Sequence, residues 1–387
     1  MDFDEDETRQ VIRTQVGELC KKFPPTYWRE KDRKKEYPRE FVDALTQAGW
    51  LAALIPEKYG GAGLGMLEAS VILEEINRSG AVATPCHAQM YTMGALLRHG
   101  NEQQKEKYLP KIAKGELRLQ SFAVTEPEAG SDTTQIKTFA KKEGDNYVIN
   151  GRKVFISRIQ HSDMMLLLAR TTPIEQVQRK TMGLSLFLVD LRNAIGNGIT
   201  ANPIETMVNH ETNELLIENL VVPSENLVGE EGRGFYHILD GMNAERILVA
   251  AECIGDSYWF IDKATTYAKN RTVFGRSIGQ NQGIQFPIAD AYARVTAANL
   301  MRYKAAQRFD QNKECGEEAN MAKLLASEAL TRVADVAMTT YGGYGLASDM
   351  DIERKFRESR LYVVAPVANN MILSYIADHV LRLPRSF

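Results

Sequence analysis

The amino-acid sequence predicts a mainly α-helical protein with a central β-rich region, because the hydrophobic periodicity changes twice along the chain. Residues 1–120 show helical spacing, residues 121–230 show short runs typical of strands, and helical spacing returns over residues 231–387. We therefore expect three domains with these boundaries. Strands and helices do not alternate, so a parallel βαβ sheet with a dinucleotide fingerprint is not expected. The spacing in the first region is carried by Phe41, Leu45, Ala48 and Leu51.

The central region predicts a small β-barrel or sandwich. Asn150-Gly151 separates two apolar runs, 147–149 and 153–156, and this dipeptide favours a two-residue hairpin turn. Further strands are expected at 164–168, 184–189 and 215–222. The last region predicts a bundle of long helices, which includes 252–270, 286–309 and 319–341.

Composition and charge exclude several classes of protein. The 387 residues include 47 basic and 50 acidic side chains, so no basic surplus indicates a nucleic-acid partner. No apolar run reaches the ~18 residues of a membrane span. Four of the first six residues are acidic, unlike a secretory or mitochondrial leader. Four scattered cysteines without a CxxC pair, and dispersed histidines, predict neither a metal site nor a disulfide framework. This composition indicates a reducing cytosolic or matrix compartment, and we expect a cytoplasmic protein.

One candidate binding segment is the turn after a predicted strand, residues 122–132. Its hydroxyl groups and backbone N–H groups, including those of Thr125 and Ser131, are suited to hydrogen-bond a flat heterocycle or a phosphate. An ordinary polar loop is the alternative interpretation.

Glu245 is a candidate general base. A helix predicted over 233–268 carries an apolar stripe that leads onto Glu245 and Arg246. A buried carboxylate is costly unless it is paired or functional, and burial raises its pKa toward the range that a base needs. A structural ion pair between Glu245 and Arg246 is the alternative. The stripe consists of Phe235, Ile238, Leu239, Met242, Val249 and Cys253.

Two glycine-containing segments are weaker candidates. Arg271 leads into Phe274-Gly275, with Gln282 following, and an arginine fork there could hold a pyrophosphate, although a surface arginine is the simpler interpretation. Gly342 and Gly343 follow a predicted helix, where glycine permits close approach to a ligand or merely ends the helix. The charged run 351–360 predicts a solvated helix face.

Over essentially its full length the chain resembles the acyl-CoA dehydrogenases. The motifs that carry the resemblance occur in the family's order: 56–61 (Pro-Glu-Lys-Tyr-Gly-Gly), 124–132, 150–153 (Asn-Gly-Arg-Lys), Arg271 with 274–275, and 342–345. The resemblance implies an N-terminal helical domain, a central β-domain and a C-terminal four-helix bundle. It also implies FAD as cofactor, an acyl-CoA substrate, and a homotetramer built as a dimer of dimers.

The resemblance assigns roles to individual residues. Segments on either side of the flavin ring match Phe122, Val124, Thr125 and Ser131, then Phe155, Ile156 and Ser157. Residues that reach a neighbouring subunit's FAD match Arg271, Phe274 and Gln282, and the approach to the FAD pyrophosphate matches Gly342 and Gly343, with Thr339 just before them. Contacts to the substrate are expected from Ser131, Arg246 and Tyr91.

The expected base departs from the commonest family pattern. Many members carry a catalytic Glu near the C-terminus, where this chain has Pro366. The isovaleryl and long-chain types instead place the Glu just before an Arg on the helix that opens the last domain, and Glu245-Arg246 matches that arrangement. Pro366 also lacks the N–H with which the family polarises the thioester carbonyl. Further departures are Thr339 for a common Gln, and Ala368 and Asn370 for a Thr and a Gln.

The leading prediction is FAD-dependent α,β-dehydrogenation of a neutral medium-length or branched acyl-CoA in fatty acid metabolism, with Glu245 as base and an electron-transfer flavoprotein as acceptor. The helix near residues 83–97 has no central Arg or Asp that would bind a dicarboxylate. Alternatives with the same fold are a monooxygenase, an enoyl-CoA reductase or a desulfinase; a nitroalkane oxidase would need a carboxylate at Pro366. A non-catalytic flavin- or acyl-CoA-binding subunit is a third possibility.

Overall fold

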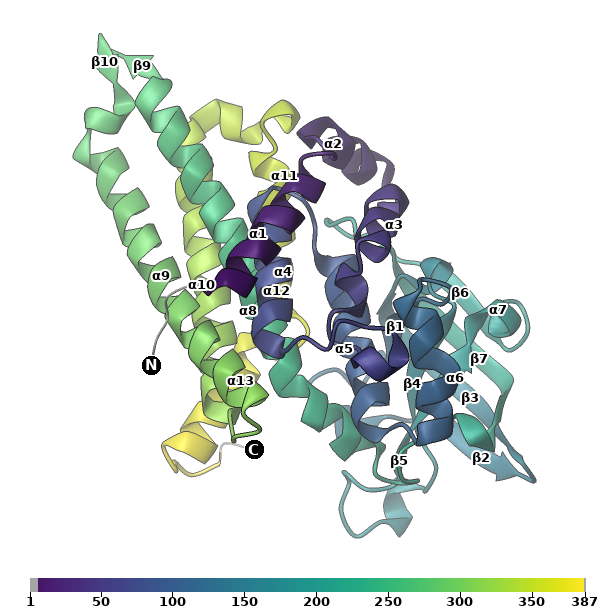
Figure 1. Ribbon diagram of the computed structural model, residues 1–387. Coiled ribbons are helices and arrows are strands. Elements are labelled where there is room, and N and C mark those ends of the chain that lie inside the picture. The colour runs from purple at the N-terminus through teal and green to yellow at the C-terminus, as the bar shows by residue number, and fades with distance from the viewer. Residues whose placement is uncertain (1–5, 386–387) are drawn as a thin grey trace. The chain divides into compact units, whose positions relative to one another are not determined.

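The structure, a computed structural model, describes residues 6–385, and helices account for most of the chain. The helices are α1 (Glu7–Cys20), α2 (Pro25–Lys34), α3 (Arg39–Gln47), α4 (Met66–Arg78), α5 (Thr84–His99), α6 (Glu102–Ala113), α7 (Leu191–Ala194), α8 (Gly234–Asn270), α9 (Gln282–Asp310), α10 (Gly316–Tyr341), α11 (Ile352–Ser359), α12 (Leu361–Val364) and α13 (Asn369–Tyr375) (Figure 1). The strands are β1 (Leu119–Ala123), β2 (Phe139–Glu143), β3 (Asn146–Ser157), β4 (Met164–Arg170), β5 (Leu184–Asp190), β6 (Ile199–Pro203), β7 (Thr212–Pro223), β8 (Leu227–Val228), β9 (Thr272–Val273) and β10 (Arg276–Ser277).

The chain packs as two compact units. Unit 1 comprises Met1–Lys34, Gly65–Ala83 and Asn243–Phe387, and unit 2 comprises Lys35–Leu64 and Thr84–Met242. Helix α8 belongs to both, because the division falls between Met242 and Asn243. The sequence-based domain boundaries near residues 120 and 230 remain predictions.

Unit 1 is helical. Helices α9 and α10 pack along each other, and α4 packs against α1 and α9. Helix α4 also approaches α8 closely: a Cβ placed on Gly255 would lie 2.2 Å from the backbone oxygen of Glu74, so a larger residue cannot stand there. At the far end of α8 and α9, β9 and β10 form a short antiparallel hairpin (Figure 1).

Unit 2 is built on an eight-stranded sheet in the order β6-β7-β3-β2-β4-β5-β8, with β1 pairing parallel to β4. Strands β4 and β5 are apolar on both faces because both faces are covered. On one face, Met165, Leu167 and Phe187 pack against Tyr147 and Leu215 of β3 and β7. Two layers of the sheet therefore pack together, as in a sandwich.

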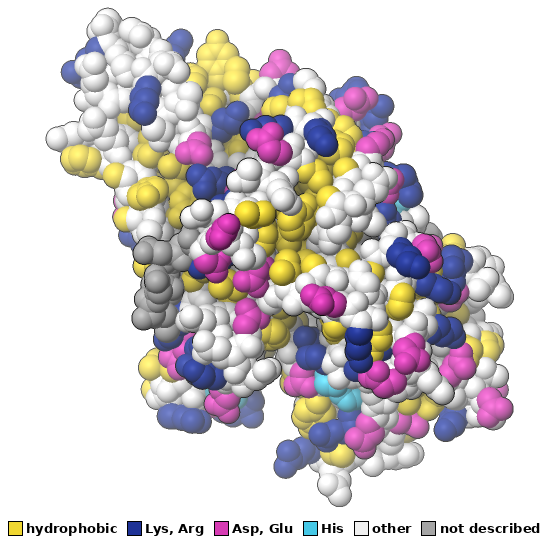
Figure 2. Space-filling view, in the orientation of Figure 1, with side chains coloured by type: hydrophobic (Ala, Val, Ile, Leu, Met, Phe, Trp, Pro, Cys, Tyr) yellow, Lys and Arg dark blue, Asp and Glu magenta, His cyan; other side chains and the backbone are white. Residues whose placement is uncertain are grey.

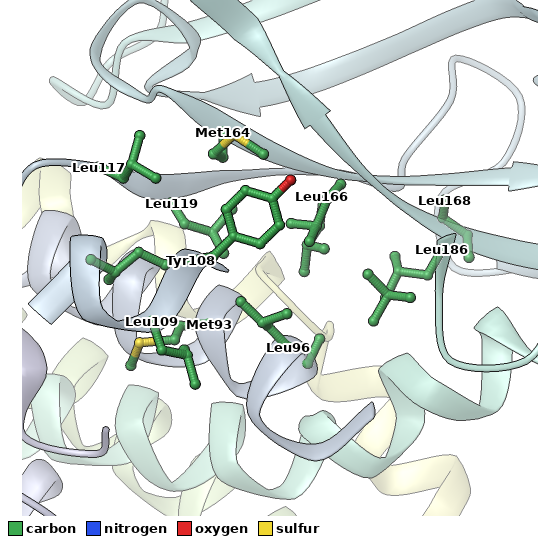
Figure 3. Packing of buried hydrophobic residues seen from close by; sticks show 14 of the residues in the cluster. Met93, Leu96, Tyr108, Leu109, Leu117, Leu119, Met164, Leu166, Leu168 and Leu186 are labelled. Atoms are coloured by element: carbon green, nitrogen blue, oxygen red, sulfur yellow. The ribbon is translucent and has the colours of Figure 1, made fainter. Parts of the chain in front are cut away.

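The other face of β4 and β5 packs against helices. Leu166, Leu168 and Leu186 meet Met93 and Leu96 of α5, and Figure 3 shows these side chains from the sheet and the helix pointing toward one another. All of these side chains are fully buried. This contact gives α5 its fixed position in unit 2, and that helix carries Tyr91, one of the predicted substrate residues.

Two local predictions from the sequence are wrong. Asn150-Gly151 is no hairpin turn, because β3 continues through it with a shift of register against β7. Glycine is needed there for another reason: a Cβ on Gly151 would lie 2.3 Å from the Thr138 hydroxyl oxygen. The turn is instead at Gly144, where β2 meets β3 and φ is +59°.

The run 351–360 is not a solvated face either. Arg354 is 2% exposed and Lys355 is fully buried in unit 1. Arg354 donates to the backbone oxygen of Gly80 at 3.0 Å, and Lys355 donates to that of Ala81 at 3.1 Å. Lys355 also pairs with Asp256 of α8 at 2.5 Å. Arg354 and Lys355 therefore connect α11 to the turn after α4 and to α8.

Acidic and basic side chains are interspersed on the face of the molecule shown in Figure 2. A search of the described residues for a helix long and apolar enough to cross a membrane found none.

Candidate active site

A buried lysine holds the turn that follows β1 in place. Lys153 of β3 has no exposed surface, and its Nζ donates to the backbone oxygen of Val124 and to Oε1 of Glu126, each at 2.9 Å. Glu126 also accepts from the backbone N–H groups of Lys137 and Thr138. The segment that carries Val124 and Thr125 is thus held by buried bonds rather than being an ordinary mobile loop.

These interactions shift the pKa values of the pair. Burial lowers the pKa of Lys153 to about 8, although Glu126 opposes the shift. For Glu126 burial would raise the pKa, but the charge of Lys153 and the hydrogen bonds from Thr138 and Lys137 hold it below its ordinary value. The pair is ionised at neutral pH.

The predicted flavin-contact residues of β1 and β3 lie side by side in unit 2. The backbone N–H of Val154 donates to the oxygen of Thr125 at 2.9 Å, and Ser121 Oγ donates to the oxygen of Ser157 at 2.9 Å. Phe122, on β1, contacts the Tyr91 ring of α5 at 5.5 Å between centroids. The structure therefore brings Thr125, Ser157, Phe122 and Tyr91 into one neighbourhood.

Phe155 has an unusual conformation. Its φ is +59°, rare for an aromatic residue, and the register of β3 against β7 shifts between Lys153 and Ile156. As a result the Phe155 side chain is 63% exposed, whereas Ile156 lies in the hydrophobic core at 2%. An exposed aromatic ring is suited to pack on a flat heterocycle, and left-handed residues cluster at functional sites. Ile156 can offer only its backbone.

Ser131 lies in the exposed part of the turn. Its neighbour Asp132 accepts from the backbone N–H of Thr134 at 3.2 Å, which orders the segment. A Cβ on Gly130 would meet nothing within 4 Å, so this turn leaves room for a ligand to approach the backbone.

In unit 1, Glu245 is 3% exposed on α8, among the buried residues Ala244, Ile247 and Leu248. This confirms the burial that the apolar stripe predicted, with one difference: Leu239 is 44% exposed. The sequence interpretation did not identify two further carboxylates buried on the same helix, Glu252 and Asp256.

Arg246 lies half-buried next to Glu245. Its Nη1 donates to Oδ1 of Asn243 at 3.3 Å. Burial lowers the pKa of Arg246, and the charge of Glu245 opposes that shift. The two charges therefore attract one another, which keeps open both the catalytic and the ion-pair interpretation of Glu245.

The remaining predicted cofactor residues are at the ends of long helices of unit 1. Arg271 and Phe274 are exposed at the β9–β10 hairpin, with Phe274 fully so at a φ of +51°, and Gln282 is exposed at the start of α9. Helix α10 ends at Tyr341; Gly342 has a φ of +58°, and a Cβ on Gly342 or on Gly343 would meet nothing within 4 Å.

Those glycines leave open backbone of the kind that a phosphate group can approach. Thr339 is exposed one turn earlier, on α10. The Tyr341 ring stacks on Tyr267 of α8 at 4.1 Å between centroids, which fixes the end of α10.

The C-terminal loop holds no acidic side chain at the position where many relatives carry the base. Pro366 is exposed there, after a cis Ala365–Pro366 peptide bond. The loop lies between two buried anchors, Tyr362 and Asn369. Within residues 6–385, no cluster of three or more potential metal ligands occurs.

Sequence reasoning missed the buried lysines that hold these segments, Lys153 and Lys323. One signal was available for Lys153: it continues the inward-facing alternation of Tyr147 and Ile149 along β3. No comparable signal marks Lys323, which lies in an apolar stretch of α10.

Comparison with known proteins matches the whole chain. Models described as the N-terminal, middle and C-terminal domains of acyl-CoA dehydrogenase match residues 6–116, 121–220 and 232–381. Acyl-CoA dehydrogenase fadE12 of Mycobacterium bovis is 34% identical over 100% of this chain and 99% of its own length. The caffeyl-CoA reductase-Etf complex subunit CarC of Acetobacterium woodii is 34% identical over 87% of this chain and 88% of its own.

A solved structure of an acyl-CoA dehydrogenase also matches the whole chain. Butyryl-CoA dehydrogenase from Megasphaera elsdenii superposes with a TM-score of 0.92 at 30% identity, over 99% of this chain and 100% of that one. The fold and the matched residues thus define an FAD-dependent oxidoreductase, and the chain belongs to the acyl-CoA dehydrogenase family. The fold class and cofactor expected from the sequence are confirmed.

Proposed function

We propose that the protein catalyses α,β-dehydrogenation of a neutral medium-length or branched acyl-CoA, with Glu245 as the general base. The observation that carries the proposal is the carboxylate of Glu245, 3% exposed on α8 and followed directly by Arg246. A thioester α-proton is weakly acidic, so a base shielded from water and an acceptor for the β-hydrogen are both required.

In this reaction Glu245 takes the α-proton, and the β-hydrogen leaves with its electron pair as the carbon–carbon double bond forms. Bound FAD supplies the acceptor for that hydride. In unit 2, the exposed ring of Phe155 and the hydroxyls of Thr125 and Ser157 suit a flat ring system. In unit 1, the open backbone of Gly342 and Gly343 suits a phosphate group. Phe122, Val124, Ile156 and Thr339 complete the proposed cofactor contacts, and Ser131, Arg246 and Tyr91 the proposed substrate contacts.

Arg271, Phe274 and Gln282 are proposed to reach the FAD of a second copy of the chain in a homotetramer, built as a dimer of dimers. A fully exposed aromatic ring is unfavourable in water, so Phe274 is better explained by a partner surface. Mass measurement of the native protein tests the assembly, and a monomer that retains FAD would contradict it.

The proposed electron acceptor is an electron-transfer flavoprotein. The CarC relative is named as a subunit of a complex with such a protein, which supports the proposal. The four cysteines are all buried free thiols, so we also propose a reducing, cytoplasmic location.

A neutral acyl group is proposed because the buried centre of α5 carries no Asp, Glu, Lys or Arg side chain. Thr84–His99 places its only arginine, Arg98, at the last turn. Titrating the oxidised flavin with a series of acyl-CoA esters, without oxygen, measures which chain length bleaches the flavin fastest.

Glu245→Gln tests the base. The variant should bind FAD, yet its flavin should be reduced by acyl-CoA at least 10³-fold more slowly than the wild type. The matched control is Glu252→Gln, a second buried carboxylate two turns further along α8, whose reduction rate should stay within a few-fold. Equal rates in Glu245→Gln and the wild type would refute the role of Glu245.

A second candidate reaction is the reverse one, reduction of an enoyl-CoA, and two observations favour considering it. Pro366 departs from the usual pattern, and the CarC relative is named a caffeyl-CoA reductase. Reoxidation of the reduced flavin by enoyl-CoA faster than its reduction by acyl-CoA would favour this direction. Oxygen consumption coupled to substrate would indicate a monooxygenase instead.

A further inference from the structure

Helix α5 and strand β1 are each buried except at one aromatic ring. Every residue from Thr84 to Leu96 on α5 is buried apart from Tyr91. On β1, Leu119–Ala123 is buried apart from Phe122. These two exceptions contact each other, with their ring centroids 5.5 Å apart. The surface of unit 2 that remains open at this point is therefore aromatic on both sides.

The side chains next to Tyr91 on α5 take up little space beside its ring. Residues three and four positions away are the neighbours of a residue on a helix surface. Three of these four neighbours have a small side chain or none: Ala88, Gly94 and Ala95. The fourth is His87, whose ring centroid lies 5.8 Å from that of Tyr91. The surroundings of Tyr91 are therefore low on one side and aromatic on the other.

The angles between these rings favour the binding of another flat ring. The plane of Tyr91 lies at 65° to that of Phe122 and at 55° to that of His87. Aromatic rings prefer edge-to-face or offset contacts, because the electron-rich face of one ring attracts the electropositive edge of the next. A ligand ring placed against Tyr91 and Phe122 gains such contacts in addition to the burial of apolar surface. A linear alkyl chain gains the burial alone.

The two elements offer no charged partner to an ionic ligand here. From Thr84 to Leu97, α5 contains no Asp, Glu, Lys or Arg side chain. The residues that flank Phe122 on β1 are Ser121 and Ala123. A charged group would lose hydration against this surface without gaining an opposite charge from either element. The surface therefore suits an uncharged ring.

This aromatic surface lies beside the proposed flavin contacts of unit 2. Phe122 precedes Val124 by two residues. Its neighbour Ser121 donates from Oγ to the backbone oxygen of Ser157 at 2.9 Å. Because Val124 and Ser157 are proposed to contact the flavin, Phe122 and Tyr91 belong to the part of unit 2 where the acyl group is proposed to react.

We propose that the acyl group of the substrate carries an aromatic ring on its β-carbon, so that the substrate is a 3-arylpropanoyl-CoA, and that Tyr91 and Phe122 bind this ring. The inference rests on the proposed function and narrows its neutral acyl group to one chemical class. Dehydrogenation removes one hydrogen from the α-carbon and one from the β-carbon. The product is a 3-arylacryloyl-CoA, in which the new double bond is conjugated with the ring.

A pair of matched substrates tests the class. 3-Phenylpropanoyl-CoA and 3-cyclohexylpropanoyl-CoA have the same carbon skeleton, but only the first carries a flat aromatic ring. Without oxygen, the phenyl ester should reduce the flavin with a second-order rate constant about tenfold higher, since each ring contact contributes a few-fold to about tenfold. Octanoyl-CoA is the linear comparison and should rank below the phenyl ester. A rate constant for the cyclohexyl or octanoyl ester that equals or exceeds that of the phenyl ester overturns the inference.

Two variants of Tyr91 locate the preference. Tyr91→Leu should lower the ratio of the phenyl to the cyclohexyl rate constant toward equality, whereas Tyr91→Phe, which keeps the ring, should retain the ratio. Phe122→Leu should lower it as Tyr91→Leu does. If Tyr91 were merely structural, Tyr91→Leu would change both rate constants together. An unchanged ratio in Tyr91→Leu therefore contradicts the assignment of the ring contact to Tyr91.

Binding of the products to the wild-type protein gives a test that needs neither catalysis nor a variant that folds. Cinnamoyl-CoA and 3-cyclohexylacryloyl-CoA differ in the same way as the two substrates, and calorimetry should give a Kd about tenfold lower for cinnamoyl-CoA. Equal Kd values overturn the inference even if an acyl-CoA reduces the flavin. Failure of the proposed function is recognised separately, because then no acyl-CoA reduces the wild-type flavin, whatever the two Kd values are.

Discussion

Lys153 in the sheet of unit 2 and Lys323 in the helices of unit 1 are both fully buried, and each holds another segment of its unit by hydrogen bonds. Lys153 has a carboxylate partner, Glu126, at 2.9 Å. Within the described residues, Lys323 donates to uncharged oxygens, those of Val367 and Asn369. Burial lowers the pKa of each to about 8.

The difference shows two ways to place a buried cation. An ion pair offsets the loss of hydration but makes each partner depend on the other, so that removing one leaves a buried charge. Neutral acceptors compensate less of the hydration free energy that a buried lysine loses, but removing that lysine leaves no unpaired charge in the core. The comparison therefore predicts different consequences for the same substitution at the two positions.

The largest effect is expected for Lys153→Met. Without the ammonium, Glu126 becomes an unpaired buried carboxylate, and the free energy of unfolding should fall by about 3–5 kcal/mol. Urea unfolding measures this. The double variant Lys153→Met with Glu126→Gln should be more stable than Lys153→Met alone, and a double variant that is still less stable would contradict the charge explanation.

Lys323→Met should lower the free energy of unfolding by a smaller amount, about 1–3 kcal/mol. It leaves the acceptor oxygens of Val367 and Asn369 unsatisfied but creates no unpaired charge. The same urea experiment compares it with Lys153→Met. If Lys323→Met proved the more damaging of the two, the distinction between paired and unpaired burial would be wrong for this protein.

The pH dependence sharpens the contrast. The pKa of Lys323 is about 8 in the folded protein against 10.5 ordinarily, so the unfolded chain binds more protons between these values. The contribution of Lys323 to the free energy of unfolding therefore rises with pH in that window, by at most about 1.4 kcal/mol per pH unit. Below that window the lysine is charged in both states, and its burial destabilises the folded protein to the full extent. The stability difference between wild type and Lys323→Met should accordingly increase from pH 8 to pH 10, and a constant difference would show that the buried group does not titrate there.

The smallest effect is expected next to Lys153 on the same strand. Arg152 pairs with Glu214 across β3 and β7, but its side chain is 59% exposed. Arg152→Met should leave the free energy of unfolding almost unchanged, because water screens such exposed pairs. A loss as large as that of Lys153→Met would mean that burial is not what separates these neighbouring cations.

Much of the fold could be predicted from local patterns in the sequence. The spacing of apolar residues predicted the long helices α8, α9 and α10, and short apolar runs predicted β4, β5 and β7. The burial of Glu245 followed from the same reasoning, since one face of a helix must be covered. The assignments of individual residues to FAD and substrate remain predictions.

Where local signals failed, a neighbour distant in sequence decided the outcome. Asn150-Gly151 has the preferred chemistry of a hairpin turn, yet strand β7 pairs with β3 on both sides of it and keeps the strand extended. The charged run 351–360 has the composition of a solvated helix, yet Gly80, Ala81 and Asp256 supply partners that bury Arg354 and Lys355.

The sequence by itself determined the class of fold, the family, the cofactor and the buried carboxylate on α8, because periodicity and motif order are properties of the chain alone. Only the tertiary structure decided that Lys153 and Lys323 lie inside and hold the Thr125 and Ala368 segments in place. The reason is physical: whether a charged side chain is buried depends on acceptors that other parts of the chain bring to it, and spacing along the sequence does not record them.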